Sequence, residues 1–322
     1  MKSKFLIVML VLSLSLSCGV AMATPSANQG YSLATASRGS AYNIIGQKLV
    51  DMVKATSGIP IVASTTDGSL DNVAIMSKNI NVLALVQNDV LHWAFQGEMM
   101  FKGKKNSRLR LLACLYDEPV FLVARKSANI KSPKDLKGHS ICIGLEGSGP
   151  EAESIIVLDI IGYNLDKDFP HHIHGSYATM AKLLNEGKID ACFVTGNANL
   201  QNIRAACANT PLDIVNFPTE MLDNLSAKYP CFWYHIVPAN TFDNDNLVQT
   251  PCVMAMLASD YALPDEVVNG VLTALFDKAN LQKLQSLNSS AAKISLDGAY
   301  MALSVPYHRA AINFFKANGV IK

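Results

Sequence analysis

The stretch LRLLACLYDEPVFLVAR at residues 109–125 decides the fold. It consists of two apolar, strand-like runs that are joined by Asp117, Glu118 and Pro119. The stretch interrupts an alternation of strands and helices, and its second run is long enough to pass from one lobe of a protein to another. We therefore expect the chain to leave a first lobe here and to build a second lobe beyond it.

Strand, small polar turn and helix alternate three times before this stretch. Strands are predicted at 31–36, 59–64 and 81–89, and a segment with helical periodicity follows each of them. This alternation is typical of parallel strands that are joined by crossover helices. The predicted fold class is therefore α/β.

A second long apolar run, CFWYHIVPANTF at 231–242, is predicted to carry the chain back to the first lobe. No Gly- and Ser-rich linker separates two consecutive domains. This favours a discontinuous first lobe, residues 24–121 with 241–322, and a contiguous second lobe, residues 122–240. Two lobes joined in this way would leave a cleft between them.

The first 23 residues have the three-part pattern of a secretory signal peptide. Lys2 and Lys4 precede an apolar run at 5–16, and AMA at 21–23 gives a small-x-small cleavage site. The run is shorter than the ~20 residues of a membrane span. We expect cleavage after this segment and export to the periplasm. The alternative, a lipoprotein anchored at Cys18, has a poor lipobox.

Composition and charge exclude several classes of function. Half of the 322 residues are hydrophobic, 16% are charged, and the formal net charge is +1. No stretch concentrates lysine and arginine, so we expect neither nucleic acid nor an anionic membrane surface as a partner. The exported chain is expected to be a soluble monomer.

Six cysteines follow the predicted signal peptide, and none of them forms a C-x-x-C pair. Zinc and thioredoxin-like sites therefore have no support. An oxidising compartment permits disulfides, and Cys231 with Cys252 is the preferred bridge because the two flank one loop. Buried free thiols are the alternative, above all for Cys114 and Cys142, which lie in apolar runs.

Four loops share one chemistry, since each follows an apolar run, contains Gly with Ser or Thr, and precedes a helix. They are TASRGSAY at 35–42, STTDGSLDN at 64–72, LEGSGPE at 145–151 and VTGNANL at 194–200. First-turn amide groups of a helix lack partners and carry partial positive charge, which suits a carboxylate or a similar small anion. In open α/β sheets such loops lie where ligands bind. The alternative is that each loop only caps its helix.

Three polar side chains are candidates for more specific contacts. Arg38 could bind a ligand carboxylate through two parallel hydrogen bonds, or it could be a solvated arginine on a loop. Gln87 could bind an amide or hydroxyl group of a ligand, or make a turn hydrogen bond. Glu118 could accept a hydrogen bond from a ligand amine or hold a hinge together. The residues predicted to bind the ligand are Ser37, Arg38, Gly39, Ser40, Tyr42, Thr66, Gly68, Ser69, Gln87, Glu118, Gly147, Ser148, Gly149, Thr195 and Gly196.

No motif of an enzyme is complete in the sequence. GLEGSG at 144–149 reverses the dinucleotide fingerprint, there is no P-loop, and Ser148 lacks the frame of a nucleophile elbow. PHHIHG at 170–175 is the one candidate metal-binding cluster in the sequence. Adjacent histidines point apart, so a solvated loop is the simpler interpretation. We therefore expect a binding protein with no metal, no cofactor and no catalytic residues.

The order of these motifs resembles a known family. TASRGSAYNIIG, TDGSLDN, LALVQNDV, YDEPVFLVAR, IKSPKDLKGHSICIGLEGSG, GKIDACFVTG and VPANTF are similar to the TAXI family of solute receptors for TRAP transporters, over about residues 31–318. The resemblance implies a type II periplasmic binding protein fold with a hinged cleft. It also implies capture of a small carboxylate, glutamate among them, and its delivery to a membrane permease that is driven by an ion gradient.

Two of the ligand loops depart from the family pattern. In the first, usually T-G-G-T-G-G-x-Y-Y-P, Arg38 replaces a threonine, Ala36 and Ser37 replace glycines, and Ile44 replaces the proline. In the third, Pro150 stands where a threonine is usual. An added arginine favours a second acidic group on the ligand, as in a dicarboxylate. A periplasmic sensor for the same ligands and a secreted enzyme on the same fold are the alternatives.

Overall fold

The computed structural model describes residues 30–301, 303 and 305–322. The predicted signal peptide and Cys18 lie outside these residues. Ten strands of the described chain form one sheet, in the order β2-β1-β3-β10-β4-β7-β5-β6, with β8 beside β4 and β9 beside β10. The strands are β1 (Tyr31–Ala34), β2 (Ile61–Ser64), β3 (Val82–Gln87), β4 (Leu109–Arg125), β5 (Ile141–Ile143), β6 (Ile173–His174), β7 (Ala191–Thr195), β8 (Leu212–Ile214), β9 (Trp233–Val237) and β10 (Val248–Asp260).

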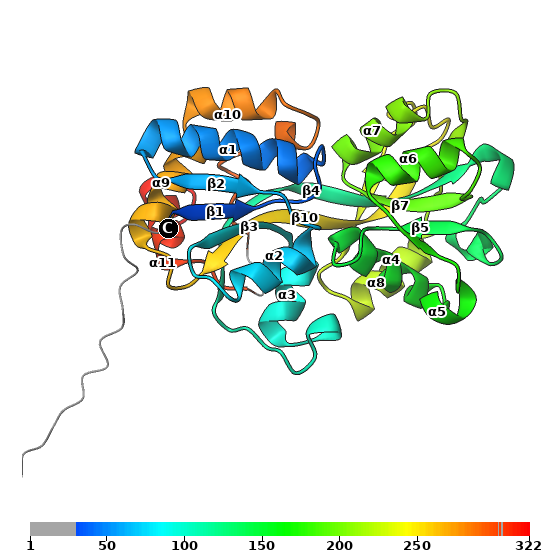
Figure 1. Cartoon of the computed structure of the whole chain (residues 1–322), viewed down its shortest axis with the longest axis horizontal. Coiled ribbons are helices and arrows are strands. Elements are labelled where there is room, and N and C mark those ends of the chain that lie inside the picture. The colour runs from blue at the N-terminus through cyan, green and yellow to red at the C-terminus, as the bar shows by residue number, and fades with distance from the viewer. Residues whose placement is uncertain (1–29, 302, 304) are drawn as a thin grey trace, which may run out of the picture.

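Helices cover both faces of this sheet in each of two lobes. In Figure 1, α1 and α10 lie above the sheet of the first lobe and α2 and α3 lie below it, while α6 and α7 lie above the second lobe and α4 and α8 below it. The helices are α1 (Ala41–Ser57), α2 (Ser69–Met76), α3 (Asn88–Gln96), α4 (Gly149–Ile160), α5 (Leu165–Asp168), α6 (Tyr177–Asn185), α7 (Asn197–Ala206), α8 (Thr219–Lys228), α9 (Asp265–Phe276), α10 (Lys278–Gln285) and α11 (Arg309–Ala317), with short 3₁₀ turns at Met99–Phe101, Lys126–Ala128, Pro133–Leu136 and Ala291–Lys293.

The stretch 109–125 is a single strand, β4, which runs through both lobes (Figure 1). Its first half pairs with β10 and its second half pairs with β7 and β8. The two predicted runs are therefore one element, and the Asp117-Glu118-Pro119 segment lies in the middle of the strand instead of in a turn. Burial of nearly every residue of β4 explains why the sequence is apolar on both faces.

The strand that returns to the first lobe is β10, and the prediction that 231–242 makes this crossing is wrong. The 231–242 run contains only β9, a five-residue strand that pairs with the first part of β10. Every second residue of β9 is open to solvent, and Tyr234 and Ile236 are about half exposed. β10 is buried along almost its whole length, as a strand through the middle of a sheet must be. The lobe boundaries at 121/122 and 240/241 stay a prediction.

A proline lies in each crossing strand at the point where the two strands part. Cys252 of β10 is opposite Pro119 of β4, and Pro251 precedes it. Beyond this point Val120 of β4 pairs with Thr195 of β7 instead. Because proline has no N–H to donate to a strand ladder, each crossing strand lacks one donor here.

The described cysteines are free, which contradicts the predicted bridge between Cys231 and Cys252. Cys252 is buried opposite Pro119 in the crossing strands. Cys231 lies just before β9, and its carbonyl accepts a hydrogen bond from the Asn88 amide at 2.9 Å. Both residues thus pack as small apolar side chains in separate surroundings. No helix within the described residues has the length and apolarity that a membrane crossing requires.

Candidate functional site

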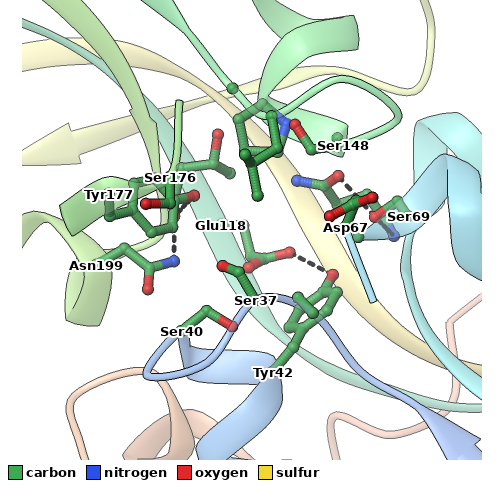
Figure 2. Close-up of a pocket in the computed structure, with 18 of the residues that line it drawn as sticks. Ser37, Ser40, Tyr42, Asp67, Ser69, Glu118, Ser148, Ser176, Tyr177 and Asn199 are labelled. Atoms are coloured by element: carbon green, nitrogen blue, oxygen red, sulfur yellow. Dashed lines mark hydrogen bonds between the residues drawn. The ribbon is translucent and has the colours of Figure 1, made fainter. Parts of the chain in front are cut away.

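A cavity lies between the two lobes, above the middle of β4 (Figure 2). It has a volume of about 50 Å³ and is bordered by the starts of four helices, α1, α2, α4 and α6, together with Asn199 of α7. The lining residues are Ala36, Ser37, Ser40, Tyr42, Asp67, Gly68, Ser69, Gln87, Glu118, Gly144, Leu145, Ser148, Gly149, Pro150, Gly175, Ser176, Tyr177, Thr195 and Asn199.

Glu118 occupies the centre of the cavity (Figure 2). Its side chain is 3% exposed, and Oε2 accepts a hydrogen bond of 2.7 Å from the Tyr42 hydroxyl. Burial raises the pKa of Glu118 to about 8, against the opposing effect of the Tyr42 hydrogen bond. None of the ion pairs among the described residues includes Glu118. The cavity therefore presents a buried acid without a counter-charge.

Serine caps fix the helix starts that border the cavity. Ser40 accepts a hydrogen bond from the Asn43 amide, Ser148 accepts one from Glu151, and Ser176 accepts one from Thr179. First-turn amide groups have no acceptor inside their own helices, and the helix dipole adds partial positive charge at this end. Several such ends around one cavity provide a neutral binding site for a negatively charged group.

Some of the first-turn backbone amides at these helix starts already donate hydrogen bonds to the other lobe. The amides of Leu70 and Asp71, in the first turn of α2, both donate to the Gly147 carbonyl of the second lobe at 3.2 Å. The Ala41 amide of α1 donates to Oδ1 of Asn199 on α7 at 3.2 Å. These bonds hold the lobes together around the cavity. The loops that we predicted to bind ligand thus also bind each other.

A buried polar chain also crosses between the lobes behind the cavity. Gln87, at the end of β3, accepts a hydrogen bond from Ser69 at 2.9 Å and donates from Nε2 to Oε1 of Glu153 at 2.7 Å. The other carboxyl oxygen of Glu153 is paired with the Thr195 hydroxyl. Glu153 is fully buried on α4, and burial holds its pKa well above the ordinary value.

The structure brings together ten of the fifteen predicted residues. They are Ser37, Ser40, Tyr42, Gly68, Ser69, Gln87, Glu118, Ser148, Gly149 and Thr195. The remaining five, Arg38, Gly39, Thr66, Gly147 and Gly196, do not line the cavity.

Arg38 and Gly39 lie in a separate outer groove, between the loop before α1 and the helices α6 and α7. This groove has a volume of about 220 Å³, and Arg38 is exposed in it. The Thr66 hydroxyl donates a hydrogen bond of 2.7 Å to the Asn72 side chain, and the Gly147 carbonyl accepts hydrogen bonds from two backbone amides of α2. Gly196 starts α7, and its own amide donates to the Pro119 carbonyl at 2.9 Å.

Sequence reasoning missed the loop before α6, which contributes Gly175, Ser176 and Tyr177 to the cavity. The signal was present, because GSY at 175–177 repeats the pattern of glycine and serine before a helix. We interpreted the three histidines that precede it as a solvated loop and did not extend the ligand site to this segment. His172 contacts the Phe169 carbonyl at 2.8 Å and His174 pairs with Glu151 at 3.4 Å. Within the described residues no group of His, Cys, Asp or Glu could hold a metal ion.

Solved structures similar to this chain are binding proteins. A binding-protein component of an ABC phosphonate transporter from Pseudomonas aeruginosa is 12% identical, with a TM-score of 0.54 over 82% of this chain and 79% of that chain. MatC from Rhodopseudomonas palustris with bound malate is 15% identical, with a TM-score of 0.53 over 90% and 95%. A substrate-binding protein of an ABC uptake transporter from Streptococcus pneumoniae with bound histidine is 12% identical, with a TM-score of 0.51 over 82% and 94%.

These likenesses confirm the predicted fold class, an α/β protein with the type II periplasmic binding protein fold. Two of these similar structures are named as binding proteins of transporters. The family model that matches the chain covers residues 33–319, which is most of its length. The chain therefore belongs to the NMT1-like family.

Proposed function

We propose that this protein is an extracytoplasmic solute-binding receptor that captures a small carboxylate between its lobes and delivers it to a membrane permease. The observation that carries the proposal is the cavity between the lobes, bordered by four helix starts and centred on Glu118. A ligand that contacts both lobes stabilises the closed form alone, and a permease can recognise that form.

The ligand class follows from the charges that line the cavity. Helix starts with serine caps suit a carboxylate, and each contributes about 0.3–1 kcal/mol, or up to ~2 kcal/mol where partly buried. Glu118 is a buried acid without an ion pair among the described residues, which suits a ligand ammonium group. We infer that a glutamate-like amino acid fits better than a dicarboxylate or a keto acid. The volume of about 50 Å³ favours the smaller members of this class.

The transport partner and the location follow from the motif order. The resemblance to TAXI receptors supports a TRAP permease as the partner, and the N-terminal pattern of residues 1–23 supports a cleaved signal peptide and the periplasm. The fold likeness to transporter binding proteins is consistent with this role. We expect the receptor to act as a monomer, with each molecule closing over its own ligand.

A thermal-shift screen of amino acids, keto acids and dicarboxylates, with L-glutamate included, tests the proposal. A ligand at 100 times its Kd stabilises the native state by about 2.7 kcal/mol, which for a chain of this size raises Tm by about 5–10 °C. Isothermal titration calorimetry then gives the affinity and the stoichiometry. If no carboxylate in the screen raises Tm, the proposed ligand class is wrong.

A further inference from the structure

Gln87 of the first lobe meets helix α4 of the second lobe at two positions one turn apart. Its Nε2 donates to Glu153 at 2.7 Å, and its Oε1 lies against the α-carbon of Gly149, where an added Cβ would stand 1.2 Å away. Residues four apart lie on the same face of a helix, so Gly149 supplies a notch and Glu153 an acceptor for one side chain. Shape and hydrogen bonding thus fit Gln87 to α4 only when the lobes are closed.

Among the described residues, the groups whose charge acts on Glu153 are acids and weak acids. From the first lobe it faces Asp89 of α3 and Tyr42 of α1, from the crossing strands Glu118 and Cys252, and from its own lobe Tyr177. Glu153 and Asp89 are both fully buried, and none of the ion pairs among the described residues includes either carboxyl. An ionised Glu153 here would be a buried charge next to other acids, which is strongly unfavourable.

Opening the lobes changes these surroundings. Gln87 and Asp89 belong to the first lobe and move away from Glu153 together, so water replaces the Gln87 amide and the neighbouring acid is removed. Both changes favour the ionised form of Glu153. The closed form therefore binds a proton that the open form releases at the same pH.

We propose that Gln87, Gly149 and Glu153 form a latch between the lobes, and that the latch holds only while Glu153 carries a proton. Glu153 does not line the cavity, so it acts through Gln87 as a positioning residue. Below the open-state pKa of Glu153 the latch contributes fully to closure, and its contribution decreases as the pH rises from that value to the raised closed-state pKa. This inference concerns closure without ligand and does not depend on the ligand class.

Hydrogen–deuterium exchange of the ligand-free protein measures the latch directly. The amides of Leu70 and Asp71 donate to Gly147 of the other lobe, so their protection, corrected for intrinsic exchange, reports the closed form. One linked proton changes the ratio of closed to open form by about tenfold for each pH unit between the open-state and the closed-state pKa. We therefore expect their protection factor to fall about tenfold or more as the pH rises from about 5 toward the closed-state pKa of Glu153.

The variant Glu153→Gln keeps the shape and the neutral hydrogen-bonding capacity of the protonated acid. We expect it to retain wild-type protection of Leu70 and Asp71 at low pH and to show a weaker pH dependence, since Glu118 and Asp89 still titrate in this variant. Asp159→Asn is the matched control, because Asp159 lies on the same helix, pairs with Lys228 and is about half exposed. This control is expected to follow the wild-type profile.

Gly149→Ala tests the shape of the latch. The new methyl group displaces the flexible end of Gln87 without touching the backbone of the first lobe, so the fold should persist while protection is low at every pH. The proposal is overturned if wild-type protection does not change with pH, if Glu153→Gln shows the same pH dependence as the wild type, or if Gly149→Ala is as protected as the wild type at low pH.

Discussion

The inner cavity and the outer groove are neighbours, and the first contains a buried acid while the second contains a basic residue. Both are lined by Ser37, Ser40, Ser176 and Tyr177, and both lie between the loop before α1 and helix α6. The cavity contains Glu118, which is 3% exposed and lies on a strand through the middle of the sheet. The groove contains an arginine on an exposed loop. The two ionisable residues that we predicted to contact one ligand lie in two different environments.

The difference shows that burial decides how strongly a charged residue can act on a ligand. In the cavity an ionic contact is screened by little water. A contact between a ligand and Glu118 can therefore contribute several times more binding free energy than the same contact at the surface. In the groove Arg38 is surrounded by solvent, where an ion pair contributes about 0–1 kcal/mol. The predictions below test this contrast, from the largest expected effect to the smallest.

Replacing Glu118 should have the largest effect on binding. In Glu118→Gln the acceptor for a ligand ammonium loses its charge while its volume and its contact with Tyr42 can persist. Removing one partner of a buried charge pair costs about 2–5 kcal/mol, so we expect the Kd for L-glutamate in calorimetry to rise about 100-fold.

Asp117→Asn is the matched control for this measurement. Asp117 is adjacent on β4, points to the opposite face of the strand, and does not line the cavity. We expect an unchanged affinity in this variant. Equal losses in Glu118→Gln and Asp117→Asn would mean that the strand, and not the carboxylate at its centre, determines binding.

Stability of the ligand-free protein should fall as the pH rises. Burial raises the pKa of Glu118 to about 8 and that of Asp89 to about 7, while both ionise near pH 4 when the chain is unfolded. The native state therefore binds protons that the unfolded chain has released, and their stabilising contribution is lost as the pH rises through these values. We expect Tm to fall by several degrees between about pH 6 and about pH 9.

The same scan with Glu118→Gln isolates one of these acids. Its amide does not ionise, so the variant should show a shallower decrease of Tm over the same range. A wild-type Tm that is constant or rises from neutral to alkaline pH would contradict the conclusion that Glu118 and Asp89 are neutral in the native state at neutral pH.

Arg38→Ala tests the outer groove. If a ligand extends from the cavity toward Arg38, loss of the guanidinium should weaken binding of a dicarboxylate about tenfold, and Tm without ligand should change little. L-glutamate and malate compared by calorimetry show whether the effect requires a second acidic group. Unaltered affinity for both would remove Arg38 from the site and leave recognition to the cavity.

Ser40 lines both the inner cavity and the outer groove, and we expect its replacement to have the smallest effect of these variants, a small decrease of Tm. Ser40→Ala removes the cap from α1, which costs about 1 kcal/mol and lowers Tm by about 2–4 °C. Ser57→Ala, at the other end of the same helix, is the control and should leave Tm nearly unchanged. An equal decrease in both variants would mean that Ser40 stabilises α1 through general packing and not as a cap.

Local patterns predicted those parts of the site that depend on neighbouring residues. Apolar runs followed by glycine and serine correctly located the starts of α1, α2, α4 and α7, because capping uses atoms within one turn of the chain. The return strand was misplaced because β9 and β10 are both apolar, and only their neighbours in the sheet show which is central. No local pattern indicated a role for Glu153, because its hydrogen-bond partner Gln87 is 66 residues away in the sequence.

By itself the sequence determined the α/β class, the two apolar strand-like runs within 109–125, and the loops from which a ligand site could be built, since periodicity and capping are local properties of the chain. Only the tertiary structure decided that Glu118 lies inside the cavity while Arg38 lies outside it. The physical reason is that exposure depends on which distant elements pack together. Burial, in turn, sets both the pKa of an acid and the strength of its contacts.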